Sequence, residues 1–136
     1  MSTFDLTQSP TTDPQSIYRY RDGLYATDLL AAALVWLDLF TWLESNPSDL
    51  PTICQHFQIH ERPADVMLTL FKAMGLLEER EKRLHLTAVA REHLVKTSPW
   101  FIGPYYGSMK DRPVTKDYLT VLRTGKPANW ASLQDQ

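Results

Sequence analysis

The chain has 136 residues, of which 43% are hydrophobic and 22% are charged, and its formal net charge is −2. These values are ordinary for one soluble globular domain, and the slightly acidic balance weighs against nucleic-acid binding, because domains of that class are usually basic.

The one cysteine, Cys54, excludes an intramolecular disulfide and suits a reducing compartment. The N-terminus lacks the pattern of a secretory signal. The most apolar stretch, Leu29 to Leu43, is shorter than the roughly 20 residues that a membrane span needs. We therefore expect a cytoplasmic protein with no membrane partner.

The N-terminal part divides into two segments. Residues 1–16 are rich in Ser, Thr, Pro and Asp and show no periodicity, which predicts a flexible tail. Ile17 to Tyr25 carries apolar and aromatic side chains at near-helical spacing, although Gly23 weakens a continuous helix. Thr27 is expected to cap the next helix, with Asp28 favourably placed against the helix dipole.

The stretch "LLAAALVWLDLFTWL", Leu29 to Leu43, predicts a helix that is apolar on nearly every face. Such a helix must be covered on more than one side. It is either the central core helix of one domain or a helix shared between the core and a dimer interface. We favour the shared helix, because one small domain readily covers only one face. The candidate dimer-interface residues are Leu29, Leu30, Ala33, Trp36, Leu37, Phe40 and Trp42.

Two short helices are predicted next. Ser48 or Asp49 is expected to cap the first, with Pro51 in its first turn. Pro63 is expected to start the second, and Gly75 to end it. Each helix has one predicted apolar stripe. The stripes consist of Leu50, Ile53, Cys54 and Phe57, and of Met67, Leu70, Phe71 and Met74.

A β-hairpin is predicted after Gly75. Leu76 and Leu77, then Leu84 and Leu86, flank the polar tip "EEREKR", so that alternate residues face the core. Helices followed by a turn, a helix and a hairpin define a winged helix-turn-helix. The predicted fold class is therefore mainly α, a winged helix-turn-helix with a small β-hairpin wing and extra flanking helices.

Winged helices often bind DNA through the outward face of the second helix, which needs Arg, Lys, Asn or Gln to contact base edges. Between residues 48 and 86 the chain has five basic and six acidic residues, so it offers little to neutralise phosphates. A small transcription regulator therefore remains only the alternative, and we expect no nucleic-acid partner. The predicted outward face consists of Ala64, Asp65, Leu68, Thr69 and Lys72.

Two further helices are predicted after the hairpin, in "TAVAREHLVK", with Val89, His93 and Leu94 on one side, and in "KDYLTVLRTGK", which Gly125 ends. Between them lies "SPWFIGPYYGSM", an aromatic segment broken by Pro and Gly. Aromatic side chains with polar tips often line ligand pockets, but they equally pack a segment onto a core. The candidate substrate-binding residues are Trp100, Phe101, Tyr105, Tyr106 and Met109.

The remaining reactive side chains have structural interpretations. His56 and His60 are four residues apart, but no nearby cysteine or third histidine completes a metal site, so no metal is expected. Cys54 lies on an apolar stripe and is expected to be an inert core thiol. His93 is expected to be a partly buried structural histidine.

The order and spacing of these elements resemble the N-terminal dimerisation domain of small-molecule O-methyltransferases, the S-adenosylmethionine-dependent enzymes of the caffeate and hydroxyindole type. The resemblance covers Ile17 to Trp130. It implies that the chain forms a homodimer. It also implies that this domain forms part of the wall of the pocket that binds a small aromatic or polyketide-like acceptor. The residues that carry it are Leu39, Phe40 and Leu43, the run Met74 to Leu77, Leu86 and Thr87 with Ala90 and Leu94, and "LRTGKPANW" from Leu122 to Trp130.

One departure from that family concerns the catalytic domain. None of the five glycines forms a G-x-G pattern after an apolar strand. We therefore expect residues 17–130 to form a winged-helix dimerisation domain, and residues 131–136 to start a linker to a missing catalytic domain. No catalytic or cofactor-binding residue is expected in this chain. S-adenosylmethionine would belong to the full-length enzyme, and whether the chain itself is an enzyme stays open.

Overall fold

The computed structural model describes residues 11–12 and 26–126. Within these residues the chain is mainly α-helical, with one two-stranded antiparallel sheet. The predicted fold class, mainly α with a small β-hairpin, is therefore confirmed. Most of the predicted tail, the segment Ile17 to Tyr25 and the predicted linker at residues 131–136 lie outside the described residues.

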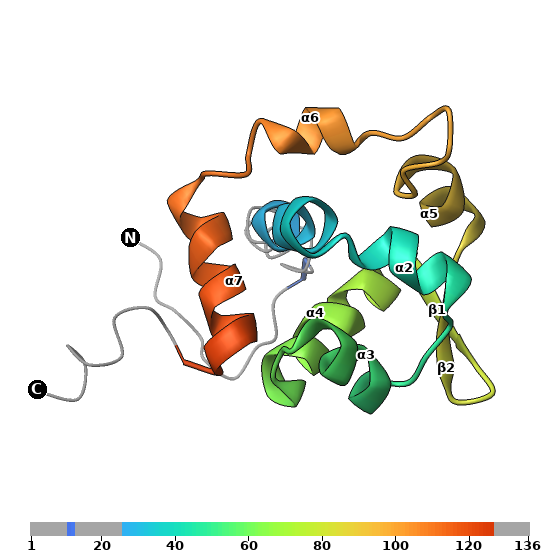
Figure 1. The fold of residues 1–136 in the computed structure, drawn as a ribbon, viewed down its shortest axis with the longest axis horizontal. Helices are drawn as coiled ribbons and strands as arrows, with labels where there is room; N and C mark the ends of the chain where they lie inside the picture. The colour runs from blue at the N-terminus through green and yellow to red at the C-terminus, as the bar shows by residue number, and fades with distance from the viewer. Residues whose placement is uncertain (1–10, 13–25, 127–136) are drawn as a thin grey trace, which may run out of the picture.

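The first helix, Ala26–Leu37, lies in the centre of the fold (Figure 1), and its second half is the π-helix η1, Ala32–Leu37. It ends at Asp38, whose φ of 55° is left-handed. Asp is one of the few residues besides glycine that adopt this conformation. Helix α2, Leu39–Ser45, then leaves at an angle of 65°. The single helix predicted for Leu29 to Leu43 is therefore wrong.

The bend explains how one chain covers so much apolar surface. Helices α6 and α7 contact η1, whereas α5 and the hairpin contact α2, so the two halves are covered by different neighbours. A straight helix would present its apolar faces along one line and need longer neighbours to cover them. The residues of this stretch that are buried within the chain are Leu30 to Leu34, Leu39, Phe40 and Leu43.

Among the described residues, no single helix combines the length and the apolar character of a membrane span. Only the bent pair Ala26–Leu37 and Leu39–Ser45 reaches both together.

Thr27 and Asp28 do not cap this helix, because Ala26 is already helical. Asp28 is only 3% exposed. Its carboxylate accepts hydrogen bonds from Arg112 at 2.7 and 3.2 Å and from the Thr115 hydroxyl at 2.8 Å. The role of Asp28 was missed because these partners lie more than 80 residues away, where local spacing gives no sign of them.

A helix-turn-helix follows, but its second helix does not begin at Pro63 as predicted, since His60 is its N-cap and Glu61 its first residue. Helix α3, Leu50–Phe57, begins after Asp49, whose side chain accepts a hydrogen bond from the Thr52 N–H at 3.0 Å. Helix α4, Glu61–Ala73, is followed by Gly75 with a φ of +77°, which favours glycine.

The predicted outward face of α4 is wrong for two residues. Ala64 and Leu68 are 0% and 2% exposed, and they belong to the core cluster. Helix α4 contacts α3, the hairpin and α7, so its buried arc is wider than one apolar stripe. Met74, which was assigned to the buried stripe, is 41% exposed at the end of the helix.

The hairpin pairs β1, Leu77–Arg80, with β2, Arg83–Leu86, in the register Leu77 to Leu86. Its two-residue turn is Glu81 and Lys82, both with positive φ, which is the geometry of a type I′ turn. Leu84 and Leu86 alternate inward and are buried, as predicted.

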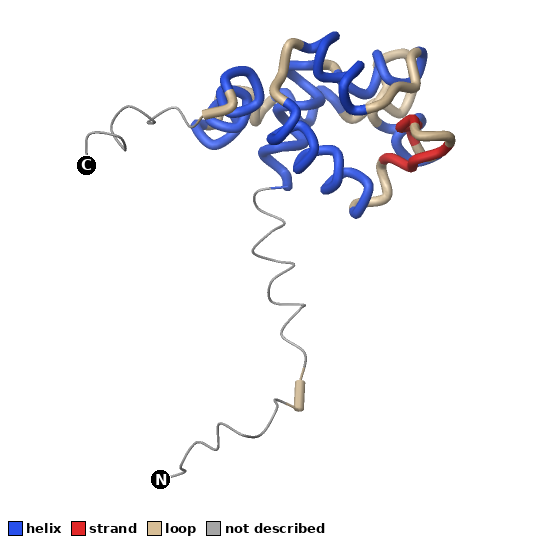
Figure 2. Tube along the Cα trace, turned by 90° about the horizontal axis from the view of Figure 1, so that it is seen from below, coloured by secondary structure: helices blue, strands red, loops and turns tan. Residues whose placement is uncertain are grey.

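Three helices complete the described chain: α5, Ala88–His93; α6, Gly103–Gly107; and α7, Pro113–Thr124. On α5 the prediction for Val89 is wrong, because it is 49% exposed while Ala90 and Leu94 are buried. The hairpin and α7 lie at opposite ends of the fold (Figures 1 and 2).

Candidate functional site

The aromatic segment between α5 and α7 is anchored at its start to the bend between η1 and α2. The Lys96 backbone N–H donates a hydrogen bond to the Thr41 hydroxyl at 3.1 Å, and the Lys96 ammonium lies 3.1 Å from the Asp38 carboxylate. The backbone N–H of Ile102 then bonds the His93 carbonyl at 2.9 Å. These contacts fix where the segment leaves α5.

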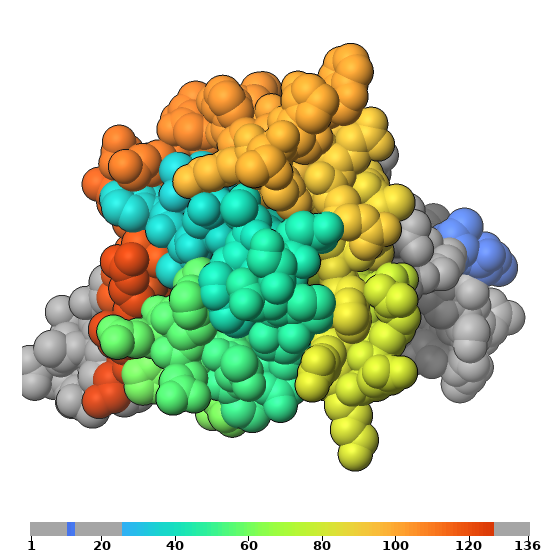
Figure 3. Space-filling model, turned by 45° about the vertical axis from the view of Figure 1, so that its right-hand side comes forward, coloured from blue at the N-terminus to red at the C-terminus, as the bar shows by residue number. Residues whose placement is uncertain are grey.

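A second anchor holds the end of the segment. The indole N–H of Trp36 donates a hydrogen bond to the Lys110 carbonyl at 3.0 Å, and the Lys110 ammonium lies 4.5 Å from the centre of the Trp36 ring. Because both anchors are on the first helix and the bend, the segment crosses over them. Figure 3 shows its orange atoms lying against the cyan atoms of the first helix.

The five candidate substrate-binding residues do not all point the same way. Trp100 and Tyr105 are 65% and 68% exposed, whereas Phe101 and Tyr106 pack against the core. Met109 is half-buried. The Tyr105 and Tyr106 rings meet edge to face at 5.5 Å. Two large aromatic side chains of the segment, Trp100 and Tyr105, therefore point outward. Phe101 and Tyr106 form its packed base.

Two ionisable side chains, Tyr106 and His93, lie in or beside this packed base. Burial raises the pKa of the Tyr106 phenol, and Tyr105 raises it further, so the phenol stays protonated near neutral pH. His93 is half-buried, and its Nδ1 lies 3.3 Å from the Trp100 carbonyl oxygen. This contact agrees with a structural histidine that holds the backbone of the segment.

The seven candidate interface residues also divide by exposure. Leu30, Ala33 and Phe40 are at most 5% exposed within the single chain, so they have little surface left for a partner. The other four are half-buried. Trp36 is engaged with Lys110, and Trp42 stacks on His56 at 4.1 Å. The two half-buried residues without such a contact are Leu29 and Leu37.

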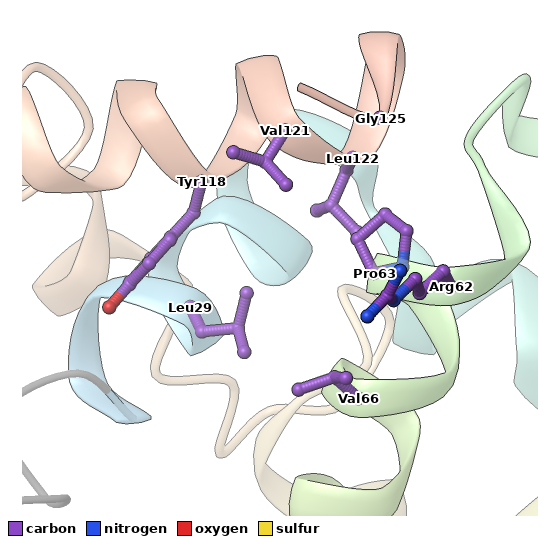
Figure 4. Close-up of a pocket in the computed structure, with 8 residues that line it drawn as sticks. All are labelled: Leu29, Arg62, Pro63, Val66, Tyr118, Val121, Leu122 and Gly125. Carbon is purple, nitrogen blue, oxygen red and sulfur yellow. The ribbon is translucent and has the colours of Figure 1, made fainter. Parts of the chain in front are cut away.

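A hollow of about 360 Å³ lies between the first helix, the start of α4 and α7. Figure 4 shows Tyr118 and Leu29 at one end, and Arg62 and Val66 at the other. None of the five residues of the aromatic segment lines it. The complete set of lining residues is Leu29, Arg62, Pro63, Val66, Tyr118, Val121, Leu122 and Gly125.

The contact between α4 and α7 closes one side of this hollow. The backbone N–H of His60 bonds the Leu122 carbonyl at 2.7 Å. A Cβ on Gly125 would lie 3.1 Å from the His60 ring, and the φ of this glycine is +75°. A side chain at this position would therefore be strained and would press against the start of α4.

A second, polar hollow of about 240 Å³ lies between α3, α4 and the hairpin. Its charged lining is mixed, with three acidic and two basic side chains, so it has no anion-attracting field of the kind that DNA binding needs. The charged side chains are Asp49, Asp65, Lys72, Glu79 and Lys82.

The side chains that could bind a metal have other roles. The His56 ring stacks on Trp42 and meets Phe57 edge to face at 4.7 Å. Cys54 is buried, and burial raises the pKa of its thiol, which keeps it protonated and unreactive. Among the described residues no group of three or more His, Cys, Asp and Glu side chains is arranged to hold a metal ion.

Comparison with known proteins identifies the relatives of this chain. No family model matches it. It is 41% identical over 83 residues to 3-hydroxy-5-methyl-1-naphthoate 3-O-methyltransferase of Streptomyces sahachiroi, a match that covers 61% of this chain and 24% of that enzyme. The crystal structure of an O-methyltransferase family 2 protein from Planctomyces limnophilus, in complex with apigenin, superposes with a TM-score of 0.82 at 31% identity. That match covers 99% of this chain and 40% of the other. The resemblance to O-methyltransferases is therefore confirmed.

Two further solved structures share the fold. PigF with SAH superposes with a TM-score of 0.63 at 27% identity, over 76% of this chain and 33% of PigF. Human N-acetylserotonin methyltransferase in complex with SAM gives 0.64 at 18% identity, over 79% of this chain and 33% of the enzyme. At that identity the likeness shows the fold alone. The chain thus spans between a quarter and two fifths of the relatives that it matches.

The sequence identified the aromatic segment but missed the apolar hollow. Leu29, Val66 and Val121 come from three separate segments, and no local pattern brings them together. A signal available in the sequence was Val66, an apolar residue that belongs to neither the predicted stripe nor the predicted outward face of α4. The structure leaves it 65% exposed.

Proposed function

We propose that this chain forms the part of a small-molecule O-methyltransferase that joins two subunits and helps to wall the acceptor site. The observation that carries the proposal is the match to the P. limnophilus protein over 99% of this chain but only 40% of the other. A chain that accounts for two fifths of such a protein supplies one of its parts.

The aromatic segment supports the role in the acceptor site. Trp100 and Tyr105 are large, amphipathic and mostly exposed, and both are held on a base anchored at Asp38 and Trp36. Rigid aromatic side chains of this kind stack well on planar ligands. The names of two relatives include a naphthoate and apigenin, which are both planar aromatic molecules. We propose an acceptor of the same class, aromatic or polyketide-like.

We further propose that S-adenosylmethionine acts in the complete enzyme but is bound outside these residues. Relatives were solved with SAH or SAM. The sheet of the described residues has two antiparallel strands, and no glycine-rich turn connects either of them to a helix. Such a turn is the usual way to bring backbone N–H groups close to a nucleotide cofactor. Calorimetric titration of the chain with S-adenosylmethionine should therefore give no binding, and micromolar binding would contradict this point.

Sedimentation tests the dimer. We expect the chain to sediment as a dimer at high micromolar concentration, and a strict monomer would overturn the dimerisation role. Leu37→Lys places a charge at a half-buried position, and should shift the chain to monomer. The matched control is Glu44→Lys, at an exposed position on α2, which should leave the dimer intact. Phe40 is unsuitable for this test, because a charge at a fully buried position would unfold the chain.

The acceptor role has a separate test, because Trp100 is itself a fluorophore. Titration with apigenin should quench the emission of Trp100, and the quenching should shrink in Trp100→Phe but not in Trp42→Phe. Equal quenching in both variants would show that the ligand does not lie against the aromatic segment.

A further inference from the structure

The apolar hollow between α4 and α7 has the size and lining of a ligand site. Its volume of about 360 Å³ lies at the lower end of the range of about 300 to 1,000 Å³ for small-molecule pockets. Pockets of this kind combine apolar walls with one or a few polar groups that orient the ligand. Here the walls are aliphatic, from Leu29, Val66 and Val121, and the ring of Tyr118 closes one end.

One charged side chain faces this apolar lining. Arg62 lies on the first turn of α4, at the opposite end of the hollow from Tyr118 (Figure 4). Among the described residues Arg62 has no hydrogen bond or ion pair from its side chain. Glu61 directly precedes Arg62, and Asp65, one turn further along α4, lines the other hollow; neither carboxylate forms an ion pair with Arg62. The guanidinium is therefore available to a carboxylate, with which it forms planar paired hydrogen bonds.

We infer that this hollow binds a small planar aromatic carboxylate, with its ring between Val66 and Val121 and its carboxylate at Arg62. Charge complementarity selects the ligand, because an unpaired guanidinium at the rim of an apolar hollow favours an apolar anion over a neutral molecule of the same shape. The volume of the hollow gives room for about two fused rings. This site does not depend on the role of the aromatic segment, since the two share no residue.

The probe for the test is 1-naphthoate, with neutral 1-naphthamide as its partner of the same shape. Amide chemical shifts of the ¹⁵N-labelled chain, recorded during each titration, give both the affinity and the place of binding. We expect 1-naphthoate to shift the amides of Val66, Val121 and Gly125. Arg62→Gln should weaken 1-naphthoate about fivefold, the size of one solvent-exposed ion pair, and leave 1-naphthamide unchanged.

A second variant tests the apolar wall. Val66→Asp should weaken 1-naphthoate more than tenfold, because it places a like charge in the hollow, and the chain should still fold since this side chain is 65% exposed. Val89→Asp is the matched control, because this valine is also exposed but lies on α5, away from the hollow.

Four results would overturn the inference. They are no binding of 1-naphthoate at millimolar concentration, shifts that cluster at Trp100 to Met109 instead, equal losses for both probes in Arg62→Gln, and a change from dimer to monomer in Val66→Asp. The last result would show that a second copy of the chain covers the hollow. Neither of the first two results bears on the sedimentation of Leu37→Lys. The ligand site and the dimer can therefore be refuted independently.

Discussion

Thr115→Val isolates one hydrogen bond of the buried Asp28 carboxylate. Thr115 is fully buried on α7, and its hydroxyl donates to Asp28 at 2.8 Å. The substitution keeps the shape of the side chain and removes the donor. A hydrogen bond to a charged group contributes about 1.5 to 3 kcal/mol, and the added buried methyl group returns about 0.8 kcal/mol. We therefore expect a loss of about 1 to 2 kcal/mol in the free energy of unfolding.

The assay is urea unfolding followed by circular dichroism, with the thermal midpoint as a second measure. A loss of this size should lower the midpoint by roughly 4 to 8 °C in a domain of about this length. Thr120→Val is the matched control on the same helix, because within the described part of the chain the Thr120 hydroxyl bonds only the Lys116 carbonyl one turn earlier, at 3.0 Å. Its effect should stay within about 0.5 kcal/mol. Equal stabilities of the two variants would refute the view that Asp28 ties the first helix to α7.

Two further predictions concern the aromatic segment and the cap of α3. A Cβ on Gly103 would overlap the Phe101 ring, so Gly103→Ala should displace this ring from the core and cost about 1 to 3 kcal/mol in urea unfolding. No measurable cost would show that the ring moves freely. Hydrogen bonds from the Thr52 side chain and backbone N–H lower the pKa of Asp49 below its ordinary 3.8. Its charge therefore stabilises the fold above that value, and the benefit is lost as the pH falls through the lower, folded pKa. The stability difference between the native chain and Asp49→Asn should shrink between pH 5 and 2, and a constant difference would contradict it.

Local chemistry was enough to predict the helix-turn-helix and the hairpin. Asp49 caps α3 and Gly75 ends α4 because each residue type satisfies backbone groups within a few positions. The alternation of Leu84 and Leu86 fixed which face of the hairpin is buried. These features depend on neighbours in sequence, so the sequence alone carries the information.

The features that the sequence did not predict depend on distant partners. Asp28 was expected only to complement the dipole of a helix capped by Thr27, because Arg112 and Thr115 could not be placed beside it. Leu68 was assigned to the outward face because one apolar stripe does not reveal that α4 is covered from three sides. The hollow was missed for the same reason, since its walls come from three segments.

The bend at Asp38 changes the energetic case for a dimer. The sequence suggested that one small chain could not cover the apolar stretch from Leu29 to Leu43, which made a second copy the natural cover. The chain covers most of it alone, because the 65° bend sends its two halves against different neighbours. Fully burying a large apolar side chain contributes about 1.5 to 3 kcal/mol, and for Phe40 and Leu43 this gain is already made within one subunit. A dimer must therefore draw its energy from the half-buried positions that do not line the hollow, chiefly Leu37. It follows that Leu37→Lys should lower the mass in sedimentation from dimer to monomer. It should leave the urea midpoint of the monomer nearly unchanged. A large loss of stability without a change in mass would place Leu37 in the core alone.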